Sequence, residues 1–84
     1  MVQPSFSEAF AIVLKKHRVE RGLSKNALAT KAGIHQTHPG LLERAARNVT
    51  LNTANALAEA LGVPLSKMLA EAEEIRQSAK RAKT

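Results

Sequence analysis

The stretch from Ser24 to Gly33 constrains the fold of this 84-residue chain most strongly. Ser24 suits the N-cap of a helix, because its hydroxyl can accept a hydrogen bond from an unpaired backbone amide. Leu28, Ala29 and Ala32 then recur at helical spacing. Gly33 adopts a positive φ at no steric cost and ends the helix in a tight turn. A second apolar segment follows, so the pattern predicts two short helices joined at a glycine turn, the unit that places one helix in the DNA major groove.

An amphipathic helix is predicted before this unit, over residues 6–21. Ser5 and Glu8 form a capping-box pattern at its start, in which each side chain binds the backbone amide of the other. Gly22 supplies the left-handed stop. The inward stripe, with His17 as a satisfied residue at the edge of the core, consists of Phe6, Phe10, Val13, Leu14 and His17.

Two more helices are predicted after residue 50, and no stretch has the alternation of a strand. The first follows Thr50 as its N-cap and ends before Gly62. Its apolar stripe consists of Leu51, Ala54, Leu57, Ala58 and Leu61. The second begins at Pro64 or Leu65 and extends into the late seventies. Its stripe consists of Leu65, Met68, Leu69, Ala72 and Ile75. The expected fold is therefore all-α, with five helices around one core.

The helix after the glycine turn is the least regular, because it contains Pro39. It is expected between His35 and Ala45. Proline is tolerated only in the first turn of a helix, and it disfavours helical geometry at the residue before it, His38. Either the helix starts irregularly near His35, or it begins near Pro39 with His38 close to the cap. Gly40 adds further backbone freedom.

The charge of the chain favours a polyanionic partner. Thirteen Lys and Arg against seven Asp and Glu give a net charge of +6, and the excess gathers around the first two predicted helices. We expect an N-terminal arm over residues 1–5, one domain over residues 6–77 and a basic tail over residues 78–84. The chain has no cysteine and shows no signal or membrane span, so a cytoplasmic setting is expected.

Other chemistry is not expected. His35 and His38 lie near Glu43 in sequence, but a zinc site needs three or four ligands and the chain lacks cysteine, so no metal site is predicted. No nucleophile, base and orienting group come together, so the chain is not expected to be an enzyme, and no cofactor is implied. Only two aromatic residues are present, too few to stack single-stranded bases. The acidic residues interpreted as a solvated helix face are Glu71, Glu73 and Glu74.

The chain resembles the Cro/C1-type (XRE-like) helix-turn-helix proteins, which include phage repressors, restriction-modification controllers and antitoxins. The matching motifs are Phe10-x-x-x-Leu14 with Arg18, Gly22-Leu23-Ser24, Leu28-Ala29-x-x-Ala32-Gly33-Ile34, Leu42-Glu43-Arg44, Arg47-Asn48, Leu51, and Leu57-Ala58-x-Ala60-Leu61-Gly62-Val63. They extend over about two thirds of the chain, without a gap. The resemblance implies the five-helix, lambda-repressor-like fold, with its second and third helices as the DNA-reading unit.

The resemblance also implies roles for individual residues. Arg18 and Glu43 are expected to pair between the first and third helices. The residues expected to contact bases are Gln36, Thr37 and Leu41, since Gln suits adenine and the Thr methyl and Leu suit thymine. The residues expected to face DNA phosphates are Lys25, His35, His38, Arg44 and Arg47. This sequence departs from the family pattern at positions 35 and 38–40, within the reading helix.

These observations predict a sequence-specific binder of double-stranded DNA that regulates transcription. One such helix reads only a few base pairs, so a homodimer on a palindromic operator is expected. The residues predicted to form the dimer interface are Met68, Ala72 and Ile75. The alternatives are an antitoxin-type module that covers a toxin and binds DNA secondarily, and a protein adaptor.

Overall fold

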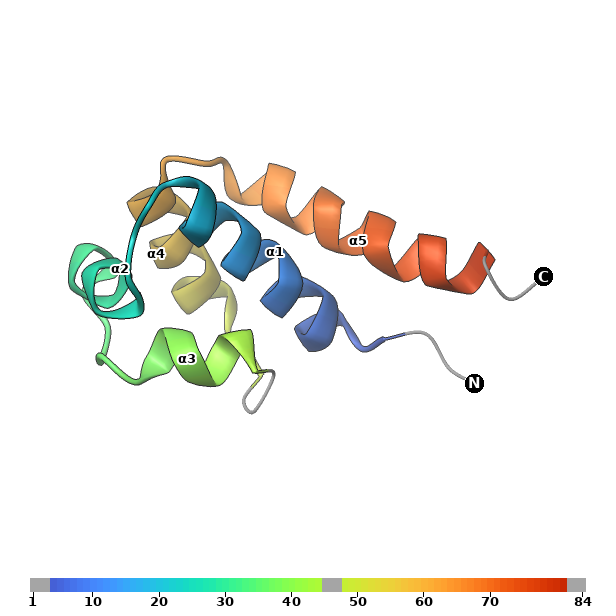
Figure 1. The fold of residues 1–84 in the computed structure, drawn as a ribbon. Coiled ribbons are helices and arrows are strands. Elements are labelled where there is room, and N and C mark those ends of the chain that lie inside the picture. The colour runs from blue at the N-terminus through green and yellow to red at the C-terminus, as the bar shows by residue number, and fades with distance from the viewer. Residues whose placement is uncertain (1–3, 45–47, 82–84) are drawn as a thin grey trace.

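The computed structural model describes the backbone of residues 4–44 and 48–81. Within this part of the chain the fold is all-α, as predicted, and contains no strand. The helices are α1 (Phe6–Glu20), α2 (Lys25–Ala32), α3 (His38–Glu43), α4 (Leu51–Leu61) and α5 (Leu65–Arg81). The order of the helices is visible in Figure 1.

The predicted caps are present at the starts of three helices. At α1 the Glu8 amide donates to Ser5 Oγ at 3.1 Å, and the Ser5 amide donates to Glu8 Oε1 at 2.7 Å. At α2 the Ala27 amide donates to Ser24 Oγ at 3.0 Å, and at α4 the Thr53 amide donates to Thr50 Oγ1 at 3.1 Å. Each cap pairs an amide that the helix itself leaves without an acceptor.

Gly33 ends α2 in the left-handed conformation, with φ +71°. Its amide donates to the Thr30 carbonyl, and the Ile34 amide reaches back to the Ala29 carbonyl at 3.0 Å. This arrangement satisfies carbonyls at the end of the helix and turns the chain sharply. The turn sets the direction in which the segment leading to α3 leaves α2.

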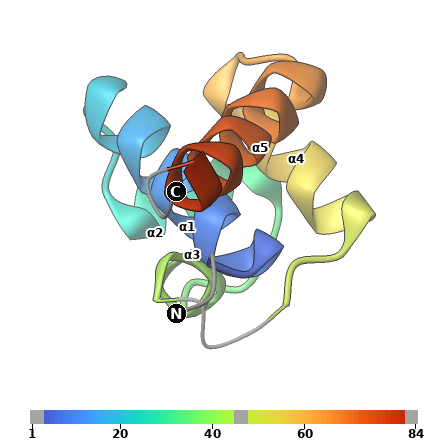
Figure 2. The same ribbon diagram turned by 90° about the vertical axis from the view of Figure 1, so that its right-hand side faces the viewer.

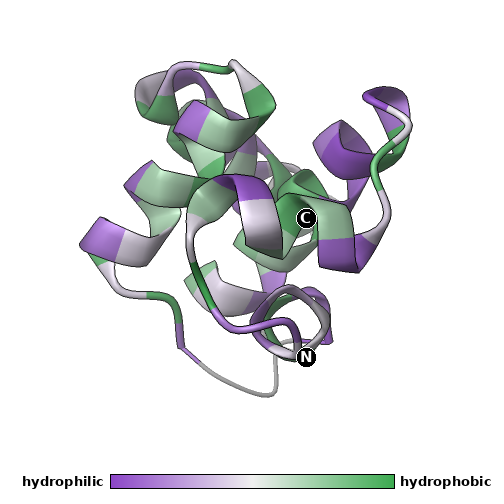
Figure 3. Cartoon of the chain, turned by 90° about the vertical axis from the view of Figure 1, so that its left-hand side faces the viewer, coloured by the Kyte–Doolittle hydropathy of each residue, from purple (hydrophilic) through white to green (hydrophobic). Residues whose placement is uncertain are grey.

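Helix α1 lies between α3 and α5, while α2 packs against α3 and α4 (Figure 1, Figure 2). Each helix carries both polar and apolar residues in Figure 3, as expected when one face is buried. The largest fully buried side chains are Phe10, Leu14, Leu28, Leu57, Leu61, Met68, Val13 and Pro39. Leu51 departs from the predicted stripe of α4, because it occupies the first position of that helix and is 73% exposed.

Helix α5 corrects the predicted dimer interface. Met68 and Ala72 have no exposed surface, because α5 lies along α1 and turns both side chains into the core of the protomer. They are therefore closed to a second copy of the chain. Ile75 is half-buried and packs against the same core. Leu65 and Leu69, from the same predicted stripe, are also only half-buried.

No helix of the described residues has the length and apolar content needed to cross a membrane.

Candidate nucleic-acid interface

A cleft between α2 and α3 gathers most of the residues predicted to contact DNA. It has a volume of about 350 Å³. Its lining comprises Lys25, Asn26, Gln36, Thr37, Gly40, Leu41 and Arg44. The two elements of the helix-turn-helix thus contribute amide, hydroxyl and cationic groups to one surface. Arg47 lies outside the described residues.

Gln36 and Thr37 lie in the turn that precedes α3, and both are exposed. The His35 ring holds this turn: its Nδ1 accepts a hydrogen bond from the Thr37 amide at 3.2 Å and lies 2.9 Å from Thr37 Oγ1. In the contact with the Thr37 amide, Nδ1 is the acceptor, which suits the tautomer that is protonated at Nε2. His35 therefore fixes the turn through one nitrogen and offers the other to solvent.

The structure decides between the two predicted starts of the reading helix. Helix α3 begins at His38, with Pro39 in its first turn and fully buried. Proline is accepted there because its missing amide has no helical partner in any case. The helix ends at Glu43, so it is shorter than the predicted span from His35 to Ala45. His38 is half-buried, and its amide donates to the His35 carbonyl at 3.0 Å.

Gly40 lies close to Lys25, a contact that the sequence did not predict. A Cβ at this buried position would lie 3.7 Å from Lys25 Cδ. The aliphatic stem of Lys25 therefore lies close to the backbone of α3, and Lys25 lines the same cleft as Gln36 and Thr37. Leu41, on the same cleft, is half-buried, whereas Leu42 packs into the core at 3% exposure.

The ion pair between Arg18 and Glu43 is present, as predicted. Arg18 Nε donates to Glu43 Oε2 at 2.6 Å, and Nη2 donates to Oε1 at 3.2 Å. The exposed fractions of the two side chains are 13% and 4%. Arg18 Nη1 also donates to the Leu23 carbonyl at 2.8 Å. This one guanidinium thus joins α1, the loop before α2 and the last residue of α3, and so holds the reading unit against the rest of the fold.

A second polar contact joins α1 to α5. His17 is 5% exposed, and its Nε2 lies 2.7 Å from Glu71 Oε1. Lys16 Nζ lies 3.7 Å from the other Glu71 oxygen. The hydrogen bond from His17 lowers the pKa of Glu71, and the positive charges of Lys16 and Lys67 lower it further. The prediction that Glu71 belongs to a solvated face is therefore wrong, because its carboxylate caps a buried imidazole.

We expect Glu71→Gln to lose about 0.5–1.5 kcal/mol of stability at pH 7, since it keeps an acceptor for His17 but removes the charge. A lowered carboxyl pKa supplies stability that is present at neutral pH and is lost as the pH falls below 4.5. The difference between wild type and variant should therefore shrink in that range. Urea unfolding across pH measures it, and Glu73→Gln, an exposed neighbour, is the control. A difference that grows on acidification contradicts the assignment.

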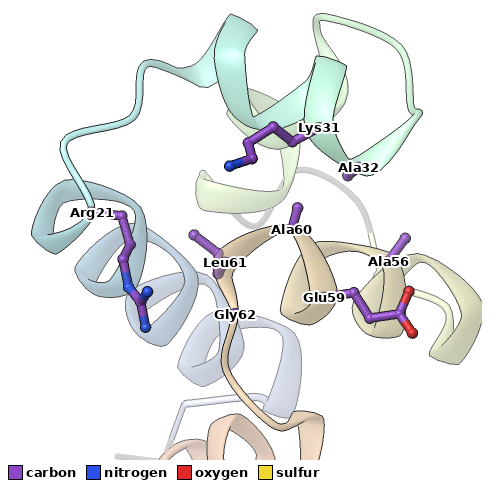
Figure 4. Close-up of a pocket in the computed structure, with 8 residues that line it drawn as sticks. All are labelled: Arg21, Lys31, Ala32, Ala56, Glu59, Ala60, Leu61 and Gly62. Atoms are coloured by element: carbon purple, nitrogen blue, oxygen red, sulfur yellow. The ribbon is translucent and has the colours of Figure 1, made fainter.

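A separate polar hollow lies where the end of α1 meets α2 and α4. Arg21, Lys31 and Glu59 surround it, together with the backbone turn at Gly62 (Figure 4). It shares no lining residue with the cleft between α2 and α3. No group of three His, Asp or Glu side chains among the described residues could hold a metal ion.

The geometry of α2, the turn and α3 is that of a DNA-reading unit, and the sequence comparisons agree. A sequence model of the family described as "Helix-turn-helix" matches residues 14–68. The chain therefore belongs to the helix-turn-helix family, in its Cro/C1-type branch, and is a DNA-binding transcriptional regulator.

Individual relatives refine this placement. The control protein C.SmaI of Serratia marcescens is 40% identical over 62 residues, which are 74% of each chain. The restriction-modification controller protein C.AhdI from Aeromonas hydrophila is 32% identical, with a TM-score of 0.71 over 74% of this chain and 94% of its own. The clp gene regulator ClgR from Corynebacterium glutamicum covers 96% of this chain and 87% of its own, with a TM-score of 0.85. Its 23% identity supports the shared fold alone.

Proposed function

We propose that this regulator acts as a homodimer on a palindromic operator, by binding alone and with no catalytic step. In this proposal α3 and the turn before it enter the major groove of each half-site. Gln36 and Thr37 contact base edges, and Leu41 packs on a thymine methyl group. The residues that approach the phosphates are Lys25, His35, His38, Arg44 and Arg47.

The observation that carries the proposal is the composition of the cleft between α2 and α3. Amide and hydroxyl groups, at Gln36 and Thr37, line the same cleft as two cations, Lys25 and Arg44. A base edge offers hydrogen-bond donors and acceptors, whereas the flanking backbone offers only negative charge. A surface that carries both kinds of group suits a DNA groove, in which base edges lie between two phosphate chains. His35 adds a free ring nitrogen beside the turn that it holds.

The direct test is in vitro selection of duplexes bound by the full chain from a random pool. We expect a selected site with twofold symmetry and half-sites about one helical turn apart, roughly 34–36 Å. Affinity for the selected site should fall steeply as salt rises, since phosphate contacts release bound counterions. An asymmetric site, no enrichment, or binding that does not respond to salt would each contradict the proposal.

The named relatives suggest a narrower role. C.SmaI and C.AhdI are described as control proteins, and the latter as a controller of restriction and modification. We propose that this chain likewise controls a restriction-modification locus. The test is a reporter fused to the DNA upstream of its own gene, together with footprinting of the purified protein on that DNA. Protection and regulation of a promoter that serves neither a nuclease nor a methyltransferase gene would contradict this role.

The dimer is proposed because one short reading helix carries too little sequence information for a genomic site. Since Met68 and Ala72 are enclosed in the protomer, the apolar side chains of α5 that can reach a second copy are the half-buried ones, Leu65, Leu69 and Ile75.

We expect Leu69→Glu to weaken self-association at least about tenfold, because it places a charge in an apolar contact. Analytical ultracentrifugation measures the dimer constant, and circular dichroism checks that the variant remains helical. Lys67→Ala, an exposed position on the same helix, is the control. If the wild type and a folded Leu69→Glu variant have equal dimer dissociation constants, the dimer interface does not lie on this face of α5.

An antitoxin-type or adaptor role, with a toxin or another protein as partner, stays a prediction. Co-expression with the neighbouring gene product tests it directly: a stable complex in which the reading cleft is blocked would favour it over the regulator proposed above.

A further inference from the structure

The outer face of α1 carries an apolar groove that the reading unit does not use. Three large hydrophobic side chains of the described residues are exposed: Ile12 at 55%, Val19 at 58% and Leu51. Ile12 and Val19 line the same groove, which has a volume of about 620 Å³. Monomeric proteins seldom gather exposed apolar side chains in a hollow that nothing occupies.

The two apolar side chains have the spacing of a helix-docking site. Ile12 and Val19 are seven residues apart on α1, so they lie on one face and about 10.5 Å from each other along the axis. Lys15 and Lys16 lie between them and also line the groove. Helices that dock in grooves use apolar anchors one or two turns apart, so the hollow suits one face of a short helix. In Figure 1, α1 lies between α3 and α5, which border this face on either side.

Two lysines, Lys15 and Lys16, lie between the two apolar ends of the groove. Lys15 forms no ion pair among the described residues, and Lys16 Nζ reaches Glu71 only at 3.7 Å, with 52% of its side chain exposed. Two carboxylates also line the groove. Glu43 is paired with Arg18, and Glu20, next to Val19 in the chain, is 58% exposed and lies 3.8 Å from His17 Nδ1. A helix that docks here therefore binds more tightly if it carries carboxylates between its two apolar anchors, where they face Lys15 and Lys16.

The same charges disfavour a second copy of this chain. A twofold axis that sets Ile12 against Val19 of a second copy also sets Lys15 against Lys16 of that copy. Like charges then face each other at the centre of the contact, which opposes association. A DNA phosphate would pair with the lysines but would leave Ile12 and Val19 exposed.

We propose that this groove docks an acidic amphipathic helix of another protein, with two apolar side chains seven residues apart and carboxylates between them. The groove shares no residue with the cleft that faces DNA. The partner can therefore bind while the regulator occupies its operator. This interaction goes beyond DNA binding and does not depend on the operator or on the dimer proposed above.

The test uses the full chain and two synthetic helical peptides. Both peptides carry two leucines seven residues apart; one has glutamates between them, and the other has lysines in their place. NMR titration of the isotopically labelled protein should show shifts at the outer face of α1 with the glutamate peptide and binding at least about tenfold weaker with the lysine peptide. Ile12→Ser and Val19→Ser should each weaken the glutamate peptide by roughly tenfold, since each removes one buried anchor.

Operator binding by the two serine variants is the internal control, because both positions lie outside the reading cleft. Unchanged operator affinity together with lost peptide binding supports the proposal. Three results would overturn it: no peptide shifts at millimolar concentration, equal binding of the two peptides, or a self-association that Ile12→Ser abolishes, which would assign the groove to a second copy.

Discussion

Replacing Arg18 by alanine is expected to cost about 3–5 kcal/mol of stability, because it leaves the Glu43 carboxylate buried and unpaired. That side chain is 4% exposed, and Arg18 supplies both of its short contacts. The Leu23 carbonyl loses a donor at the same time. A domain of this size has a free energy of unfolding of about 5–10 kcal/mol in total, so the variant should lose roughly a third of it or more. Equilibrium urea unfolding measures the loss.

Two further variants separate the buried pair from a general effect of charge. Glu59→Ala removes an exposed carboxylate and should change stability by less than about 0.5 kcal/mol. The double variant Arg18→Met, Glu43→Met removes both buried charges and should recover most of the loss, since no unpaired ion remains. If Arg18→Ala and Glu59→Ala cost the same, the pair contributes little to the fold. If the double variant is no better than Arg18→Ala, the loss comes from packing instead.

The parts of the fold that sequence predicted well are those with local signals. Ser5 with Glu8, Ser24 and Thr50 each define a helix start through contacts three residues away, and Gly33 defines a helix end through its own backbone. Such contacts depend on nearest neighbours alone and need no knowledge of the tertiary structure.

The parts that sequence predicted poorly depend on how the helices pack. The apolar stripe of α5 gives the direction of its buried face but not the depth of burial, and only the path of α5 along α1 encloses Met68 and Ala72. Leu51 fits the stripe of α4 but lies at its first position and remains exposed. The contact of His17 with Glu71 joins residues 54 positions apart, for which the sequence offers no local signal.

In the site itself, the sequence identified five of the seven residues that line the cleft, but not Asn26 or Gly40 and not the contacts that hold them in place. The chain around Pro39 admits two helix starts that differ by several residues, and the observed start at His38, with Pro39 in the first turn, decides between them. His35 bonds to Thr37 only two residues away, in the manner of the short polar side chains that hold turns. That spacing predicts a turn from the sequence alone. The contact of Lys25 with Gly40 depends instead on how α2 packs against α3, so the sequence could not predict it.

Gln36→Ala is expected to relax base preference at one position of each half-site, while Lys25→Ala weakens binding to every sequence alike. The Gln36 amide is exposed at the tip of the turn and can bond adenine N6 and N7 together, a contact that discriminates by about 1–3 kcal/mol. Lys25 offers a point charge, which any phosphate can accept. Binding of both variants to the selected operator, to versions with one changed base pair and to random duplex measures the difference.

The salt dependence separates the two roles more sharply than affinity does. Loss of a phosphate contact reduces the slope of log K against log salt by about one for each subunit bound, whereas loss of a base contact leaves the slope unchanged. Lys25→Met keeps the stem that lies on Gly40 and should reproduce the slope of Lys25→Ala. Lys31→Ala, at the other end of α2, should have a much smaller effect. If Gln36→Ala and Lys25→Ala lower the slope equally, Gln36 contacts the DNA phosphates instead of a base. Thr37 and Leu41 would then be the residues that contact the bases.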